Sequence, residues 1–121
     1  MQIESVSPIF PADDLAASIA FYCDRLGFAL AWSWGSPPDI ASVCRDGVGI
    51  TLKQRSDATR LGSAQVYVSV SGVDAWHAAF AASGVDAKVP IGNRPYGMRD
   101  FRIVDPSGNE LSFGQPIAFD F

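Results

Sequence analysis

The sequence predicts an α+β fold in which two βαβββ modules form a curved mixed sheet, with helices on the convex face and a concave ligand cup. The first observation is a repeat, because a strand, a helix and three short strands occur twice in the same order. The second is its spacing: the predicted helices start at Leu15 and Val73, 58 residues apart, and stop at Gly27 and Gly84, 57 residues apart. The periodicity of the apolar residues then predicts that the helices pack on one face of the sheet and that the other face stays uncovered.

The chain length fits one domain. At 121 residues the chain is long enough for one core but not for two independent ones. We therefore expect a single domain over 1–121, with module 1 at about 1–56 and module 2 at about 64–121. The segment 55–63 is polar and lacks periodicity, so it is predicted to be the linker.

Module 1 opens with a loosely alternating apolar segment at 3–10, which predicts a strand. Asp13 and Asp14 follow, and either carboxylate can cap a helix and complement its dipole. Apolar residues at steps of four, three and four then form one helical stripe, and Gly27 ends the helix. Three strands are predicted next, at 28–34, 40–45 and 48–54, the last two joined by an Asp46-Gly47 hairpin turn.

Module 2 repeats this order. The segment 65–70 alternates cleanly, which predicts a strand with Val66, Val68 and Val70 on one face and Gln65, Tyr67 and Ser69 on the other. A helix is predicted at 73–83, with Gly84 as its stop. Strands at 86–89, 99–104 and 109–114 complete the module.

Composition narrows the class of partner. The chain is 48% apolar, 18% charged and carries a net charge of −4 without a basic patch, which predicts a globular protein that does not bind nucleic acid. The N-terminus lacks an export pattern and no apolar run approaches membrane-spanning length, so we expect no membrane association and a cytoplasmic location. Cys23 and Cys44 lack metal-ligand spacing and are interpreted as reduced core thiols.

The most informative segment is 94–114, RPYGMRDFRIVDPSGNELSFG. It opens with a Pro-Tyr-Gly loop and turns at Asp105-Pro106-Ser107-Gly108. Proline at the second position and glycine at the fourth suit a type I turn. The two flanking runs therefore predict an antiparallel hairpin.

This hairpin, the paired βαβββ units and the helix motif Asp14-Leu15-x5-Phe21-Tyr22-x3-Leu26-Gly27-Phe28 resemble the vicinal oxygen chelate superfamily. That group contains glyoxalases, bleomycin resistance proteins and ring-cleaving dioxygenases. The chain length, Pro8 in the first strand and the closing hairpin are similar to the antibiotic-binding bleomycin resistance proteins. The resemblance implies a homodimer that sequesters a drug in clefts between its subunits and catalyses nothing.

The resemblance also locates the positions at which the enzymes of the group hold a divalent ion with His, Glu or Gln. Aligned on the helix motifs and on the hairpin glycine, these positions fall on Ser7, Thr51, Gln65 and Ser112. Hydroxyl groups are poor neutral ligands, and one glutamine cannot hold a metal alone. We therefore expect vacated metal positions, no bound metal and no cofactor.

Other catalytic groups are scarce. His77 is the only histidine, and its place in the second predicted helix removes it from the concave face. Glu110 shares a strand face with Ser112 and could border the cup, although a solvated or paired edge residue is the alternative. Without a nucleophilic triad, a phosphate loop or a matched carboxylate pair, the sequence predicts no catalytic residue.

The predicted cup offers aromatic and polar side chains. Trp32 and Trp34 lie two apart on one strand and therefore on one face, where they could stack a planar ligand or bind a cation. Packing under the helices or in a dimer contact is the alternative for both. The other predicted ligand-binding residues are Gln65 and Tyr67 on the central strand, and Tyr96 and Met98 in the Pro-Tyr-Gly loop.

Two further features have structural alternatives. Arg99 and Arg102 are placed on opposite strand faces by their odd spacing, and we expect surface salt bridges for both, with an anionic ligand group as the alternative. The apolar tail 117–121 hints at docking on a partner subunit.

These observations predict a metal-free, homodimeric small-molecule binding protein of the bleomycin resistance type. Its ligand would be amphipathic and aromatic, an antibiotic for example, and would be held at a dimer cleft. A metal-dependent lyase or oxygenase of the glyoxalase or dioxygenase kind, using Gln65, Glu110 and a third ligand, is the alternative function.

Overall fold

A computed structural model of the chain describes residues 1–56 and 63–117. The predicted linker at 55–63 and the predicted docking tail at 117–121 therefore lie largely outside the described residues. The elements are β1 (Ile9–Ala12), α1 (Leu15–Ala20), the π-helical turn η1 (Phe21–Arg25), β2 (Ala29–Gly35), β3 (Pro38–Arg45), β4 (Val48–Gln54), β5 (Gln65–Ser69), α2 (Val73–Ala82), β6 (Val89–Asn93), β7 (Met98–Val104) and β8 (Glu110–Pro116).

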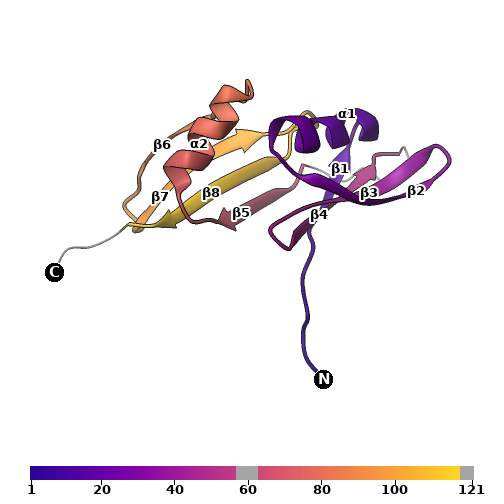
Figure 1. Cartoon of the computed structure of the whole chain (residues 1–121), viewed down its shortest axis with the longest axis horizontal. Coiled ribbons are helices and arrows are strands. Elements are labelled where there is room, and N and C mark those ends of the chain that lie inside the picture. The colour runs from indigo at the N-terminus through magenta and orange to yellow at the C-terminus, as the bar shows by residue number, and fades with distance from the viewer. Residues whose placement is uncertain (57–62, 118–121) are drawn as a thin grey trace.

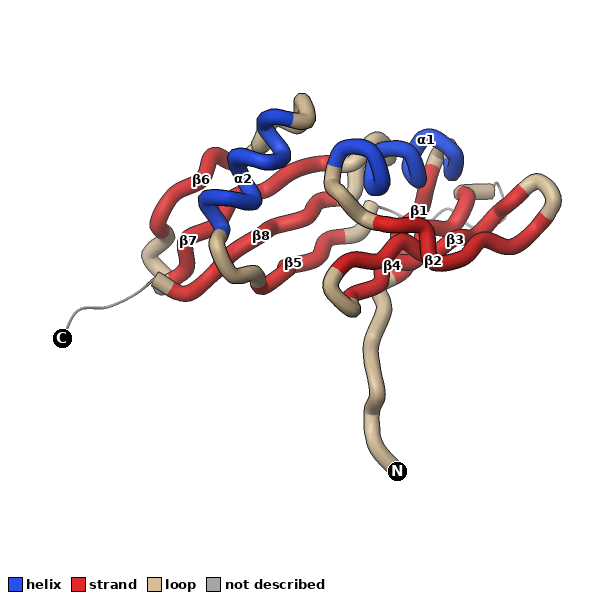
Figure 2. The backbone as a smooth tube through the Cα atoms, viewed as in Figure 1, coloured by secondary structure: helices blue, strands red, loops and turns tan. Residues whose placement is uncertain are grey.

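The repeat is visible in the sheet topology. Four strands form a sheet in the order β1-β4-β3-β2, and four form a second sheet in the equivalent order β5-β8-β7-β6. In the first sheet β1 pairs in parallel with β4, and in the second sheet β5 pairs in parallel with β8. All other neighbouring strands pair antiparallel. Both helices lie on the same side of the sheets (Figures 1 and 2). The α+β prediction with two βαβββ modules is confirmed, with two four-stranded sheets in place of one continuous curved sheet.

The first helix begins where the sequence predicts it. The Asp14 carboxylate accepts a hydrogen bond from the Ala17 N–H at 3.2 Å, as a helix cap does. The helix does not stay α-helical to its end, because α1 gives way to η1, which contains Tyr22. Gly27 follows with a φ of +75°, a conformation that a side chain would oppose, so it ends the helix as predicted.

Two predicted strands were placed wrongly. The strand expected at 3–10 is confined to β1, because β4 begins only after the Asp46-Gly47 turn and its parallel register with β1 leaves residues 3–5 without a neighbour on that strand. Residues 1–5 instead extend away from the sheets (Figure 1), whereas Ser7 and Pro8 still hydrogen-bond to β4. The strand expected at 86–89 is β6, three residues later. This strand contains Pro90, which an edge strand tolerates because proline's missing N–H need not face a partner.

The other elements match their predictions to within a few residues. The hairpin of β7 and β8 is confirmed, and its turn closes with the Gly108 N–H donating to the Asp105 carbonyl at 3.1 Å. Cys23 and Cys44 are free and half-buried. Among the described residues, no helix combines the length and apolar character that crossing a membrane requires.

A buried polar cluster joins the two modules at one end. Asp105, at the β7–β8 turn, accepts a hydrogen bond from the Tyr22 hydroxyl at 2.9 Å. Asn109, which is fully buried, donates through Nδ2 to the Pro11 carbonyl of β1 and to the Asp105 carboxylate, each at 2.8 Å. These bonds satisfy buried polar groups and fix the orientation of one sheet relative to the other.

Candidate functional site

Each sheet has one face packed against its helix and one face that no helix of this chain covers, which we call the open face. In module 1 the packed face carries Ala41, Val43, Ile50 and Leu52, all at most 2% exposed. Because side chains alternate along a strand, their neighbours lie on the open face. The open face, on the side away from the helices, is the face on which the sequence predicts the ligand cup.

Two tryptophans dominate the open face of module 1. Trp32 lies opposite Ser42, and Trp34 lies opposite Ile40, so the alternation places both rings away from α1. Trp32 is 48% exposed and Trp34 is 70% exposed. Packing under the helices is therefore excluded for this chain, and two large rings remain available to a ligand or to another subunit.

The open face of module 2 carries a hydrogen-bonded group centred on Asp100 of β7. The Tyr67 and Tyr96 hydroxyls both donate to its Oδ2, at 3.0 and 2.6 Å. The Arg94 guanidinium donates from Nε to Oδ1 at 2.8 Å, in a salt bridge whose carboxylate is 7% exposed. We call these four residues the Asp100 cluster. It fixes two half-exposed tyrosine rings on the open face by their hydroxyl ends.

The predicted residue Met98 lies at the start of β7, where it pairs with Pro116 and is half-buried. Its register places it on the same face as Asp100. The predicted residues Gln65 and Tyr67 also share that face, as their register with Glu110 and Ser112 on β8 shows. Within one chain, however, these residues belong to module 2, whereas Trp32 and Trp34 belong to module 1.

Hydrogen bonding shifts the ionisation of the Asp100 cluster. Burial raises the pKa of Asp100, but the hydrogen bonds from Arg94, Tyr96 and Tyr67 outweigh it and hold the pKa below its usual value. Burial, together with the hydrogen bond to Asp100, raises the pKa of Tyr67 to about 12. The bond to Asp100 also raises the pKa of Tyr96. At neutral pH the cluster therefore contains one carboxylate, one guanidinium and two neutral phenols.

These shifts predict a pH dependence of stability. The folded pKa of Tyr67 exceeds the unfolded value of about 10, so its contribution is complete below pH 10 and is lost as the pH rises toward 12. The folded pKa of Asp100 is depressed, so its contribution is present above its unfolded pKa and is lost as the pH falls through the folded pKa. Absorbance titration of the tyrosines should show Tyr67 ionising near pH 12. The Asp100→Asn variant should shift that ionisation toward pH 10, and the Asp74→Asn control should not.

The residues at the expected metal positions form two pairs. The Ser7 hydroxyl lies 3.2 Å from the Thr51 hydroxyl in module 1. Gln65 and Ser112 line the same small hollow of about 170 Å³ in module 2. The assignment of these four positions to metal ligands stays a prediction. The structure does bring the two members of each pair together.

These donors do not fit a divalent cation. Three of the four are hydroxyl groups, and the Ser112 hydroxyl accepts a hydrogen bond from the Arg102 guanidinium at 3.2 Å. A permanently charged guanidinium on that oxygen repels a second cation. Among residues 1–56 and 63–117, no group of three histidine, cysteine, aspartate or glutamate side chains is placed to hold a metal ion.

Glu110 and the two predicted surface arginines are engaged in ion pairs. Glu110 accepts from Lys88 at 2.5 Å and from Arg102 at 3.4 Å. Arg99 pairs with Asp74 of α2 at 2.8 Å, on the packed side of the sheet. The salt bridges expected for both arginines are confirmed. His77 lies on α2 with its ring against Phe101, which confirms that it is remote from the open face.

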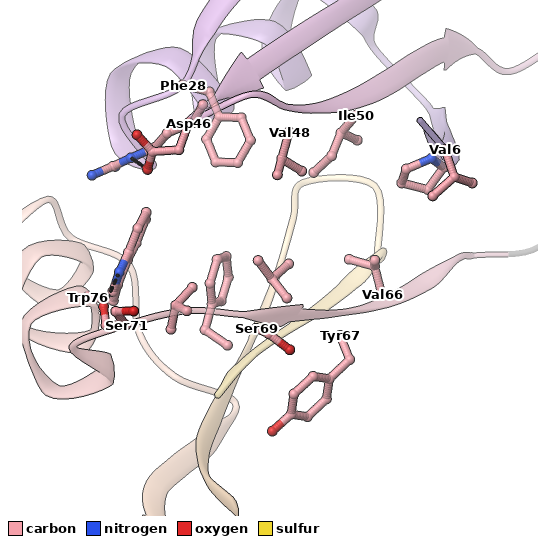
Figure 3. A pocket seen from close by; sticks show the side chains of 15 residues that line it. Val6, Phe28, Asp46, Val48, Ile50, Val66, Tyr67, Ser69, Ser71 and Trp76 are labelled. Atoms are coloured by element: carbon pink, nitrogen blue, oxygen red, sulfur yellow. Dashed lines mark hydrogen bonds and ion pairs between the residues drawn. The ribbon is translucent and has the colours of Figure 1, made fainter. Parts of the chain in front are cut away.

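A larger hollow lies between the modules. It measures about 570 Å³ and is mostly apolar, with Phe28, Val48 and Ile50 facing Val66 and Trp76 across the gap (Figure 3). The Tyr67 side chain points away from this cleft, although its strand forms one wall (Figure 3). We call this hollow the intermodule cleft. The sequence does not predict the intermodule cleft. The residues that form its walls lie on the packed faces and have the apolar pattern of ordinary core residues.

Sequence reasoning also missed Asp100 and Arg94. The sequence patterns assign Asp14 to a cap and Asp46 and Asp105 to turns, and Tyr67, one of the two tyrosines that donate to Asp100, lies 33 residues away from it. A signal was nevertheless present, since an aspartate in the middle of a β-rich segment, between Met98 and Phe101, is unlike a turn residue. Such a residue indicates a paired buried charge.

Comparison with known proteins agrees with this geometry. The family model for the glyoxalase/bleomycin resistance protein/dioxygenase superfamily matches residues 3–113. A bleomycin resistance protein from Geobacillus stearothermophilus is 25% identical, over 91% of this chain and 95% of its own. The crystal structure of TnmS3, an antibiotic binding protein from Streptomyces sp. CB03234, is 26% identical with a TM-score of 0.79, covering 97% of this chain and 99% of that one.

A second similar structure is the bleomycin-binding protein from bleomycin-producing Streptomyces verticillus, complexed with copper(II)-bleomycin. It is 24% identical with a TM-score of 0.78, and the match covers 93% of this chain and 96% of that chain. The superfamily includes enzymes as well as binding proteins, so membership alone sets the fold and not the activity. Because the family model matches nearly the whole length of this chain, the chain belongs to the glyoxalase/bleomycin resistance protein/dioxygenase superfamily.

Proposed function

We propose that this protein is a metal-free small-molecule binding protein of the bleomycin resistance type, which sequesters an amphipathic aromatic ligand in the cytoplasm. The observation that carries this proposal is the pair of exposed rings, Trp32 and Trp34, side by side on the open face of module 1. Aromatic faces bind planar ligands by stacking. Sequestration requires a preformed surface with a few polar anchors and needs no activated water or proton shuttle.

The arrangement of the aromatic residues favours a site between two subunits. One chain carries Trp32 and Trp34 on module 1 and the Asp100 cluster on module 2, on separate sheets. In a homodimer, the open face of module 1 from one subunit would face the open face of module 2 from the other. A two-fold axis would then generate two equal clefts, each with tryptophans on one wall and Tyr67 and Tyr96 on the other.

The three tryptophans allow the site to be located. Trp32 and Trp34 report on the open face, whereas Trp76 lines the intermodule cleft. Titration of the Trp76→Phe variant with metal-free bleomycin should quench the remaining fluorescence saturably. The Trp32→Phe/Trp34→Phe double variant retains only Trp76 and should show little quenching. Removing one stacking ring by Trp34→Ala should weaken binding about tenfold.

The opposite pattern would contradict this location. If bleomycin quenches only Trp76, the ligand site is the intermodule cleft, whose volume also suits a small molecule. Sedimentation of the protein at several concentrations tests the dimer independently. A monomer that binds the ligand with full affinity would refute the proposed site between subunits.

The alternative function is a metal-dependent enzyme that uses Gln65 and Glu110. The salt bridges of Glu110 to Lys88 and Arg102 oppose this, because a ligand carboxylate would have to leave both cations. Metal analysis of the purified protein distinguishes the two functions. A tightly held stoichiometric transition metal, with turnover that a chelator abolishes, would replace the binding proposal by the enzyme.

A further inference from the structure

Arg102 occupies the centre of the open face of module 2. It lies on β7 directly opposite Ser112 on β8, and Ser112 in turn lies opposite Tyr67 on β5. Arg102 and Ser112 line the hollow of about 170 Å³ together with Gln65, Glu110 and Tyr67. The Arg102 side chain is 40% exposed, so a ligand on the open face can reach its guanidinium.

The charges around this hollow do not cancel. Lys88 and Arg102 are two cations, and Glu110 is the single carboxylate that both contact. Lys88 holds Glu110 at 2.5 Å, whereas the Arg102 contact is longer, at 3.4 Å. One formal positive charge is therefore in excess. The hydrogen bond from Lys88 and the charges of Lys88 and Arg102 outweigh burial and lower the pKa of Glu110, so the carboxylate is ionised at neutral pH and the excess charge is that of one cation.

The guanidinium is also held in position. Arg102 donates from Nε to the Ser112 hydroxyl at 3.2 Å and from Nη1 toward Glu110. Its hydrogen bonds to described residues use the Nε N–H and one N–H of Nη1, so the second Nη1 N–H and both Nη2 N–H groups can donate to a ligand. A guanidinium presents parallel N–H donors that match the two oxygens of a carboxylate or sulfonate.

This arrangement coincides with two of the positions that the resemblance assigns to metal ligands, Gln65 and Ser112. From this juxtaposition we propose that Arg102 provides, as a fixed cation, the anchor for an anionic oxygen group on the bound aromatic ligand. The exposed Tyr67 ring beside it contacts the body of that ligand. The inference rests on the proposed function and adds the class of ligand, an aromatic compound bearing a carboxylate or sulfonate.

Two dyes separate charge recognition from ring binding. Anilinonaphthalene sulfonate carries an aromatic body and a sulfonate, and N-phenyl-1-naphthylamine has the same ring system without the anion. Arg102→Gln should weaken binding of the sulfonate dye by about tenfold or more while changing binding of the neutral dye less than twofold. Arg102→Lys should retain part of the affinity, because it keeps the charge but loses the fork of donors.

The matched control is Arg99→Gln, which removes an arginine from the same strand on the opposite face. It should leave the affinity for both dyes unchanged, and a chelator should have no effect on either. Thermal melts establish that each variant is folded.

Three results would overturn the inference: an unchanged affinity of Arg102→Gln for the sulfonate dye, an equal loss for both dyes, or an equal loss in Arg99→Gln. Failure of the wild type to bind the sulfonate dye would overturn it as well. The proposed function is judged separately, by the tryptophan titration with bleomycin. Saturable quenching there with a negative dye result would retain the binding function and remove only the anionic anchor.

Discussion

Replacing Asn109 by alanine should lower the stability of the protein by about 3 kcal/mol, the largest loss we expect from a single substitution. Asn109 is fully buried and its side chain serves three partners. Nδ2 donates to the Pro11 carbonyl and to Asp105, and Oδ1 accepts from the Ala64 N–H at 2.9 Å. Alanine leaves the Pro11 and Ala64 groups without partners where water has little access, and each such group costs about 1–3 kcal/mol.

For a chain of this size, a loss of 3 kcal/mol corresponds to a decrease in Tm of about 10 °C. Thermal and urea unfolding of wild type and Asn109→Ala measure it directly. Asn93→Ala is the matched control, because Asn93 is exposed on the edge strand β6 and its change should stay within about 0.5 kcal/mol. If the two variants differ little from each other, the buried cluster does not hold the modules together.

The sequence was most informative where a pattern depends only on local geometry. The strand β5 follows from valines at every second position, because a strand exposes alternate faces. The cap at Asp14 and the ending at Gly27 follow from the needs of the helix termini. The turn at Asp105 likewise follows from proline and glycine at fixed positions.

Features that depend on a distant neighbour could not be predicted in the same way. The length of β1 is limited by where β4 turns, which the residues at 3–10 do not encode. Tyr22 and Leu26 are both buried at the π-helical turn, and their spacing of four residues also suits an α-helix, so the apolar stripe does not distinguish the two helix types.

The site shows the same division. Alternation predicted that Trp32 and Trp34 share one face, and the structure agrees. The Asp100 cluster depends on contacts between Tyr67, Arg94 and Asp100, which strand pairing brings together across the sheet. Arg94, Tyr96 and Asp100 lie close together in the sequence, but the register of β5, β8 and β7 is needed to bring Tyr67 to them.

Replacing Gly114 by alanine should disrupt the Asp100 cluster and destabilise the protein by about 1–3 kcal/mol. A Cβ at Gly114 would lie 2.0 Å from the Tyr67 hydroxyl oxygen and 2.9 Å from the Asp100 Cβ. The Tyr67 ring can swing outward, but the Asp100 Cβ is fixed to the neighbouring strand. We therefore expect loss of the bond between Tyr67 and Asp100, a lower Tm, and about tenfold weaker ligand binding on the open face.

The control is Gly49→Ala in β4, also a strand glycine, where the added Cβ would meet its nearest neighbour, the Ser42 hydroxyl, at an ordinary 3.5 Å. It should be neutral or slightly stabilising, because alanine restricts the unfolded chain. Combining Gly114→Ala with Tyr67→Ala removes the clashing ring, so the double variant should lose less stability than the sum of the single variants. Additive losses, or a Gly114→Ala variant as stable as Gly49→Ala, would show that Gly114 does not make room for Tyr67 and that the cluster tolerates a side chain there.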